Sequence, residues 1–104
     1  MALNKLQFEF ASETPREMPV PFAHFGVVGS GDLEVILERS ELEGKAGVSV
    51  VTPVKGFEHI WEVVLQRFIS ESRLGNVQIS INDNNATPVV VSQRLRQALL
   101  EIED

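Results

Sequence analysis

The hydrophobic period of the chain changes at residue 57, and this change separates a region of strands from a long helix. From there on, apolar residues recur at i, i+3, i+4, i+7, i+8, i+11 and i+12, which places them on one stripe of an amphipathic helix. The stripe consists of Phe57, Ile60, Trp61, Val64, Leu65, Phe68 and Ile69. Glu58 near the start and Arg73 near the end suit the helix macrodipole, and Gly75 is expected to provide the left-handed stop.

On either side of this helix, apolar and polar residues alternate with a period of two, which predicts strands buried on one face. The expected strands cover residues 4–10, 22–28, 33–38, 47–52 and 77–82. Gly29-Ser30-Gly31-Asp32 has the composition of a tight turn, so the second and third strands are expected to form a hairpin. Residues 11–21 contain Pro15, Pro19 and Pro21, which lack an amide donor, and are expected to form a surface connection.

A second helix is predicted after a turn at residues 83–86. Thr87 suits the N-cap and Pro88 the first helical position. The residues expected to share its apolar face are Val91, Leu95, Ala98, Leu99 and Ile102. Because nearly every strand has one polar face, both helices should cover the other face. We therefore expect an α/β fold of the α+β type: a two-layer sandwich with a mainly antiparallel sheet of four or five strands and two helices on one face.

Composition limits the function classes. The 104 residues, 43% of them apolar, are expected to form a single domain over residues 1–104. The absence of cysteine excludes thiolate nucleophiles, zinc ribbons and iron–sulfur clusters, and it is typical of a reducing compartment. The formal charge of −6 argues against nucleic acid and anionic lipid as partners. No membrane span or signal-peptide core is recognisable, so we expect a cytoplasmic protein.

Ser30, between two glycines at the tip of the predicted hairpin, is the most unusual local feature. A tight turn alone would explain Gly29 and Gly31, because glycine adopts the positive φ angles that turns require. A nucleophilic serine fits poorly, because Val28 and Asp32 stand where the Gly-x-Ser-x-Gly elbow needs glycines. A third use is to present the Ser30 hydroxyl to a modifying enzyme. A small ligand-binding or assembly domain with an unmodified Ser30 remains an alternative.

Other candidates are charged residues. Asp32 either orients a modifying enzyme or bonds local amides. Arg94 and Arg96 on the last helix are candidate contacts for phosphates of an attached group or for carboxylates of a partner, although a solvated helix face explains them as well. His24 and His59 lack neighbours at ligand spacing, so we predict no metal site.

Three segments of the sequence resemble a known family, the acyl carrier protein (delta) subunit of malonate decarboxylase. The segments are Gly26-Val27-Val28-Gly29-Ser30-Gly31-Asp32-Leu33-Glu34-Val35, Thr52-Pro53-Val54-Lys55-Gly56-Phe57 with the following helix, and Ile81-Asn82-Asp83 followed by Ala86-Thr87-Pro88. With the first strand and the last helix, the resemblance covers nearly the whole chain. Asn84 and Asn85 stand where the family usually has an aromatic residue and a glycine, and Val89 stands where a glycine is common.

The resemblance implies a carrier whose Ser30 holds phosphoribosyl-dephospho-coenzyme A through a phosphodiester. The thiol of that group would carry acetyl and then malonyl thioesters. The implied partners are an acyltransferase subunit, carboxytransferase-like decarboxylase subunits and a prosthetic-group transferase, and the chain itself would contribute no catalytic side chain. The acyl carrier (gamma) chain of citrate lyase resembles the sequence around Ser30-Gly31-Asp32 and is the related alternative.

Overall fold

The computed structural model describes residues 3–26, 29 and 31–103. Seven elements follow one another along the chain. They are β1 (Asn4–Ala11), β2 (Phe22–Gly26), β3 (Asp32–Arg39), β4 (Lys45–Thr52), α1 (Glu58–Ser72), β5 (Val77–Asn84) and α2 (Pro88–Ile102). All five strands and both helices predicted from the sequence are present, with ends that differ by a few residues.

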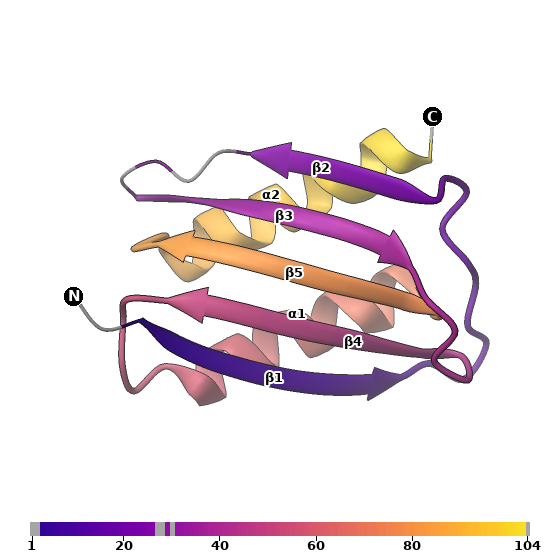
Figure 1. Ribbon diagram of the computed structural model, residues 1–104, viewed down its shortest axis with the longest axis horizontal. Coiled ribbons are helices and arrows are strands. Elements are labelled where there is room, and N and C mark those ends of the chain that lie inside the picture. The colour runs from indigo at the N-terminus through magenta and orange to yellow at the C-terminus, as the bar shows by residue number, and fades with distance from the viewer. Residues whose placement is uncertain (1–2, 27–28, 30, 104) are drawn as a thin grey trace.

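The strands form one sheet in the order β1-β4-β5-β3-β2. Neighbouring strands are antiparallel except β4 and β5, which run parallel because α1 connects them across the sheet. Figure 1 shows both helices on the same face of the sheet. The predicted two-layer α+β sandwich is therefore confirmed.

The core lies between the sheet and the helices. Buried and half-exposed residues alternate along β3, β4 and β5, as expected for strands that are covered on one side. The opposite face of the sheet carries polar side chains such as Gln78, Ser80 and Asn82. This one-sided burial explains why a period of two is visible in the sequence.

The end of α1 differs from the sequence prediction. Arg73, and not Gly75, takes the left-handed conformation that ends the helix, with φ of 58°. A Cβ at Gly75 would collide with the carbonyl oxygen of Gly44 and lie 2.6 Å from Cβ of Pro15. Glycine is present at position 75 because two other segments approach it closely, which a local pattern does not reveal.

The structure corrects three further expectations. Met18 is completely buried, so residues 11–21 are not only a surface connection. The predicted turn at residues 83–86 begins later, because Asp83 and Asn84 still belong to β5. Phe57 and Ile60 at the start of the apolar stripe remain 44% and 38% exposed, whereas its later members are buried or half-buried. These two exposed side chains lie at the site described next.

Candidate functional site

The turn between β2 and β3 is held through the neighbours of Ser30. Ser30 itself lies outside the described residues, as do Val27 and Val28 of the predicted second strand. Gly31, with φ of 75°, donates its amide to the carbonyl oxygen of Asn84 at 2.8 Å. The amide of Asp32 donates to the carbonyl oxygen of Gly29 at 3.0 Å. The residues that flank Ser30 are thus tied to each other and to the end of β5.

Asp32 and Arg94 form a bidentate ion pair beside this turn. Nε and Nη2 of Arg94 donate to the two carboxylate oxygens of Asp32, at 2.9 and 2.6 Å. These hydrogen bonds and the one from the amide of Leu33 lower the pKa of Asp32, and the same pair raises the pKa of Arg94. The pair fastens α2 to the start of β3.

The two arginines of α2 are therefore not equivalent. Arg94 is already bonded to Asp32, and its Nη1 also donates to Gln97 at 3.0 Å. Arg96 lies two positions further along, which turns its side chain to another face of the helix. It lines a groove with Arg67 of α1. The structure brings Asp32 and Arg94 together at the turn and places Arg96 elsewhere.

A second polar cluster lies on the open face of the sheet. Nε2 of His24 is 2.7 Å from one carboxylate oxygen of Glu34, and the side-chain amide of Asn82 donates to the other at 2.7 Å. These two contacts lower the pKa of Glu34. His59, in contrast, is 85% exposed at its side chain. Across the described ranges, no three His, Cys, Asp or Glu residues are grouped so that they could hold a metal ion.

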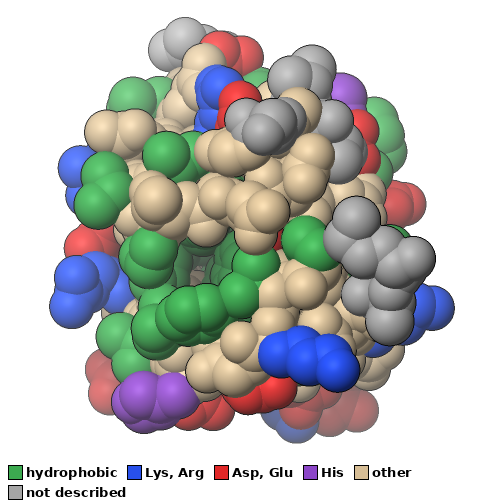
Figure 2. Space-filling view, turned by 90° about the vertical axis from the view of Figure 1, so that its left-hand side faces the viewer, with side chains coloured by type: hydrophobic (Ala, Val, Ile, Leu, Met, Phe, Trp, Pro, Cys, Tyr) green, Lys and Arg blue, Asp and Glu red, His purple; other side chains and the backbone are tan. Residues whose placement is uncertain are grey.

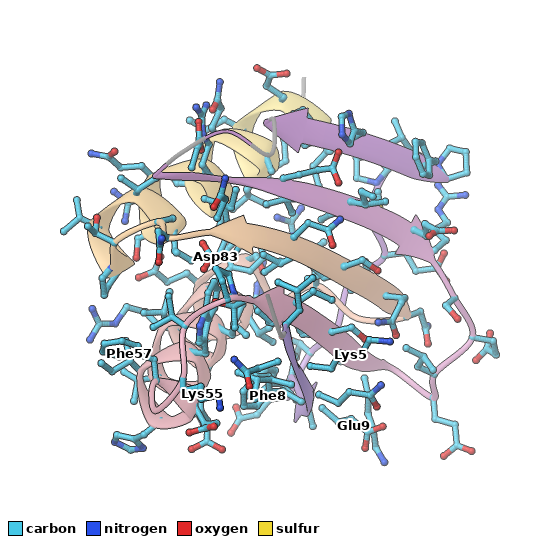
Figure 3. The ribbon with its side chains drawn as sticks, turned by 60° about the vertical axis from the view of Figure 1, so that its left-hand side comes forward. Lys5, Phe8, Glu9, Lys55, Phe57 and Asp83 are labelled. Carbon is cyan, nitrogen blue, oxygen red and sulfur yellow. The ribbon has the colours of Figure 1, made fainter. Side chains whose placement is uncertain are left out.

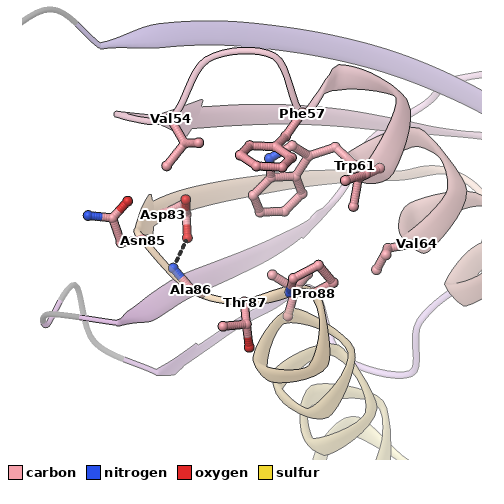
Figure 4. Close-up of a pocket in the computed structure, with 11 residues that line it drawn as sticks. Val54, Phe57, Trp61, Val64, Asp83, Asn85, Ala86, Thr87 and Pro88 are labelled. Atoms are coloured by element: carbon pink, nitrogen blue, oxygen red, sulfur yellow. Dashed lines mark hydrogen bonds between the residues drawn. The ribbon is translucent and has the colours of Figure 1, made fainter.

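An apolar pocket opens at the end of the molecule where α1 and α2 begin. Its volume is about 270 Å³, and eight of its eleven lining residues are apolar. Figure 2 shows hydrophobic side chains around a hollow at this end. In the close-up of Figure 4, Phe57 and Trp61 of the α1 region face Pro88 and Thr87 of the α2 region. The apolar stripe did not reveal this pocket. Trp61 is buried, as its place on the stripe predicts, and also lines the pocket, whereas Phe57 remains 44% exposed.

The polar part of the pocket wall includes a buried carboxylate. Asp83, only 6% exposed, accepts a hydrogen bond from the Thr52 hydroxyl at 2.8 Å and one from the Ala86 amide at 2.9 Å. The bond from Ala86 lies within residues 83–86, for which the sequence predicted a turn. The bond to Thr52 joins the ends of two parallel strands 31 positions apart in sequence. No local pattern indicates that bond.

The pocket and the serine turn lie at the same end of the sheet. Figure 1 shows that β3 begins where β4 and β5 end. Figure 3 shows Phe57 and Lys55 before the first turn of α1, at the end of the molecule that also carries Asp83. Asp83 and Asn85 line the pocket, and the residue between them, Asn84, binds the Gly31 amide. One short segment therefore connects the pocket wall to the turn.

Neither helix in the described part of the chain is long and apolar enough to cross a lipid bilayer.

The end of the molecule that carries the serine turn combines three features. They are an anchored turn, an ion pair that fastens the turn to α2, and an apolar pocket with one buried carboxylate.

Comparison with known proteins gives consistent matches. The family model of the malonate decarboxylase delta subunit matches residues 22–102. The chain is 60% identical over 99 residues to the malonate decarboxylase acyl carrier protein of Malonomonas rubra, a match that covers 95% of this chain and 88% of that protein. It is 43% identical to the acyl carrier protein of the same name from Xanthomonas euvesicatoria, over 93% of this chain and 92% of that one.

A solved structure is also similar. A chain in the crystal structure of a Pseudomonas malonate decarboxylase hetero-tetramer in complex with malonate superposes with a TM-score of 0.79 at 38% identity. The match covers 95% of this chain and 98% of that one. The sequence relatives and the structural relative therefore agree along almost the whole length.

Proposed function

The chain belongs to the family of malonate decarboxylase delta subunits, which are acyl carrier proteins, and we propose that it carries its acyl group on phosphoribosyl-dephospho-coenzyme A attached to Ser30. Membership in this family favours malonate decarboxylase over citrate lyase. The proposed link is a phosphodiester to the serine hydroxyl. When bound, the group supplies a thiol that holds acetyl and malonyl groups as thioesters.

The observation that carries the proposal is the construction of the turn on both sides of Ser30. Gly31 is exposed, and among the described residues, its chain neighbours aside, a Cβ at this position would meet no atom within 4 Å. The hydrogen bonds of Gly31 to Asn84 and of Asp32 to Gly29 fix the backbone next to the serine. An exposed and anchored Gly31 next to the serine suits a hydroxyl that another enzyme must reach and that then bears a long group.

Asp32 and Arg94 act on this turn as positioning residues. Their ion pair holds the first residue of β3 against α2. Because Arg94 is paired with Asp32, we assign it to the turn rather than to phosphates of the attached group. The chain contributes no catalytic side chain in this proposal. Its role is to hold and present the acyl group, and tethering raises the effective concentration of that group at the partner sites.

The proposed partners are an acyltransferase subunit, carboxytransferase-like decarboxylase subunits and the enzyme that attaches the prosthetic group. The hetero-tetrameric Pseudomonas relative supports an assembly with other subunits. The chain's net charge of −6 favours docking to basic rims, which speeds encounters without requiring tight binding. We further propose that residues 1–104 act as a single acyl carrier domain.

The test is the intact mass of the chain after co-expression with the enzymes that make and transfer the prosthetic group. Wild type is expected to gain the mass of phosphoribosyl-dephospho-coenzyme A on the peptide that contains Ser30. Ser30→Ala should remain unmodified, whereas Ser92→Ala, which removes an exposed serine of α2, should be loaded like wild type. An unmodified wild type, under conditions in which a known carrier is fully loaded, would refute the attachment and favour an unmodified binding or assembly domain.

A further inference from the structure

We propose that the apolar pocket between the starts of α1 and α2 receives the acetyl thioester end of the prosthetic group and disfavours its malonyl form. This inference rests on the proposed attachment at Ser30. It assigns a binding site on this chain to one of the two acyl states, and that site consists of residues that the structure describes.

The lining of the pocket suits a small neutral group. The side chains of Val54, Ile60, Trp61 and Val91 supply an apolar wall. A volume of about 270 Å³ lies just below the usual range for drug-sized ligands, so it holds only a short segment. An acetyl thioester presents a methyl group and a sulfur atom, and burying them removes apolar surface from water.

The position of the pocket suits a group attached at the β2–β3 turn. Asn84 binds the amide of Gly31 and lies between two residues of the pocket wall. Gly31, which follows the proposed attachment residue in the chain, is therefore bonded to the segment that forms part of the pocket wall. Because the group is tethered, its effective concentration at the pocket is about millimolar, and weak intrinsic binding is sufficient.

The buried carboxylate of Asp83 provides the discrimination. Its oxygens accept hydrogen bonds from Thr52 and Ala86, so it is fixed in the pocket wall. A malonyl group would bring a second carboxylate into the same small cavity, where it would lose its hydration and meet a like charge. The acetyl form is thus sheltered from water, and the malonyl form remains outside, available to a partner subunit.

The pocket can be tested without the prosthetic group. Purified, unmodified chain is titrated with S-acetyl-N-acetylcysteamine and with S-malonyl-N-acetylcysteamine, and binding is followed by NMR at the Trp61 indole and the Ala86 and Val91 methyl groups. At an effective concentration of about 1 mM, useful occupancy requires a Kd for the acetyl compound of about 1 mM or below. The malonyl compound is expected to bind at least about tenfold more weakly.

Three variants test whether acetyl binding and the discrimination against malonyl arise at this pocket. Ala86→Leu places a larger side chain in the pocket and should abolish the acetyl-dependent shifts. Asp83→Asn removes the charge and should reduce the discrimination between the two compounds to less than about threefold. Val63→Ala changes an exposed apolar residue of α1 outside the pocket wall and should bind both compounds like wild type.

The outcomes separate this inference from the proposed attachment. Absence of saturable shifts at the pocket residues up to about 10 mM acetyl compound, in folded wild type, would overturn the inference even if Ser30 is loaded. Equal binding of the two compounds would overturn the role of Asp83. Conversely, saturable acetyl binding together with an unloaded Ser30 would support a ligand pocket and refute only the attachment.

Discussion

Replacement of Thr52 by valine should destabilise the chain by about 2–3 kcal/mol. Thr52 is completely buried at the end of β4. Its hydroxyl donates to Asp83 at 2.8 Å and accepts from the amide of Val54 at 3.1 Å. Valine has the same branched shape and a similar preference for strands, so the substitution removes the hydroxyl and little else.

The magnitude follows from the two hydrogen bonds. The bond to the carboxylate contributes about 1.5–3 kcal/mol and the bond from the neutral amide about 0.5–1.5 kcal/mol. Burying a methyl group in place of the hydroxyl offsets about 0.8 kcal/mol, which leaves a range of about 1–4 kcal/mol with its middle at about 2–3 kcal/mol. For a chain of this size, the net loss lowers Tm by roughly 10–20 °C.

Urea unfolding at neutral pH, followed by the fluorescence of the buried Trp61, measures this loss. Thr52→Ser is the control that keeps the hydroxyl and removes only a methyl group. In a double-mutant cycle with Asp83→Ala, the coupling between the two positions should be at least about 1 kcal/mol. A loss below about 0.5 kcal/mol for Thr52→Val, or additive effects in the cycle, would show that the bond does not stabilise this end of the sheet.

Three further changes test other parts of the structure by the same unfolding assay. Because the folded-state pKa of Asp32 is lowered below 3.8, its pair with Arg94 stabilises the fold above about pH 4, and this contribution disappears as the pH falls through the lowered pKa. The urea midpoint of Asp32→Asn should therefore approach that of wild type on acidification, and a constant gap would contradict the pairing. Gly31→Ala should lower the free energy of unfolding by about 1–2 kcal/mol, which is the cost of the left-handed conformation for alanine. Gly26→Ala, at φ of 80°, should lower it further, because the added Cβ collides with the Leu33 carbonyl oxygen. Equal losses for the two variants would contradict the collision. Thr87→Ala, which removes the cap that accepts from the amide of Val90 at 3.3 Å, should cost about 0.5–1 kcal/mol, and a loss within error of zero would show that the cap is not formed.

The sequence predicted the parts of the fold that depend on local periodicity. A sheet covered on one side produces a period of two, and a helix on a sheet produces a stripe, so all seven elements could be recognised. Thr87 and Pro88 also act as expected at the start of α2, because capping depends on residues within one turn. The choice of Ser30 came from its glycine neighbours and the family resemblance, and it remains a prediction.

The long-range contacts of the site could not be read in the same way. Asp32 and Arg94 are 62 positions apart, and either residue alone is compatible with solvent, a partner or a phosphate. Thr52 and Asp83 meet only because β4 and β5 run parallel and end side by side. Likewise, the left-handed residue after α1 is Arg73 rather than Gly75, since the glycine is required by the approach of Gly44.

The pocket shows how a regular pattern can have two physical outcomes. The apolar stripe of α1 begins at Phe57, but its first members remain partly exposed, whereas Leu65 lies in the closed core. The spacing is the same along the whole stripe, so periodicity assigns all of it to the core. Burial stabilises the fold in proportion to the area removed from water, so Phe57 and Ile60 contribute less to stability than their size suggests. Apolar side chains that remain exposed beside an anchored turn are available for a ligand, and this availability is the physical basis for assigning the pocket to the acyl group.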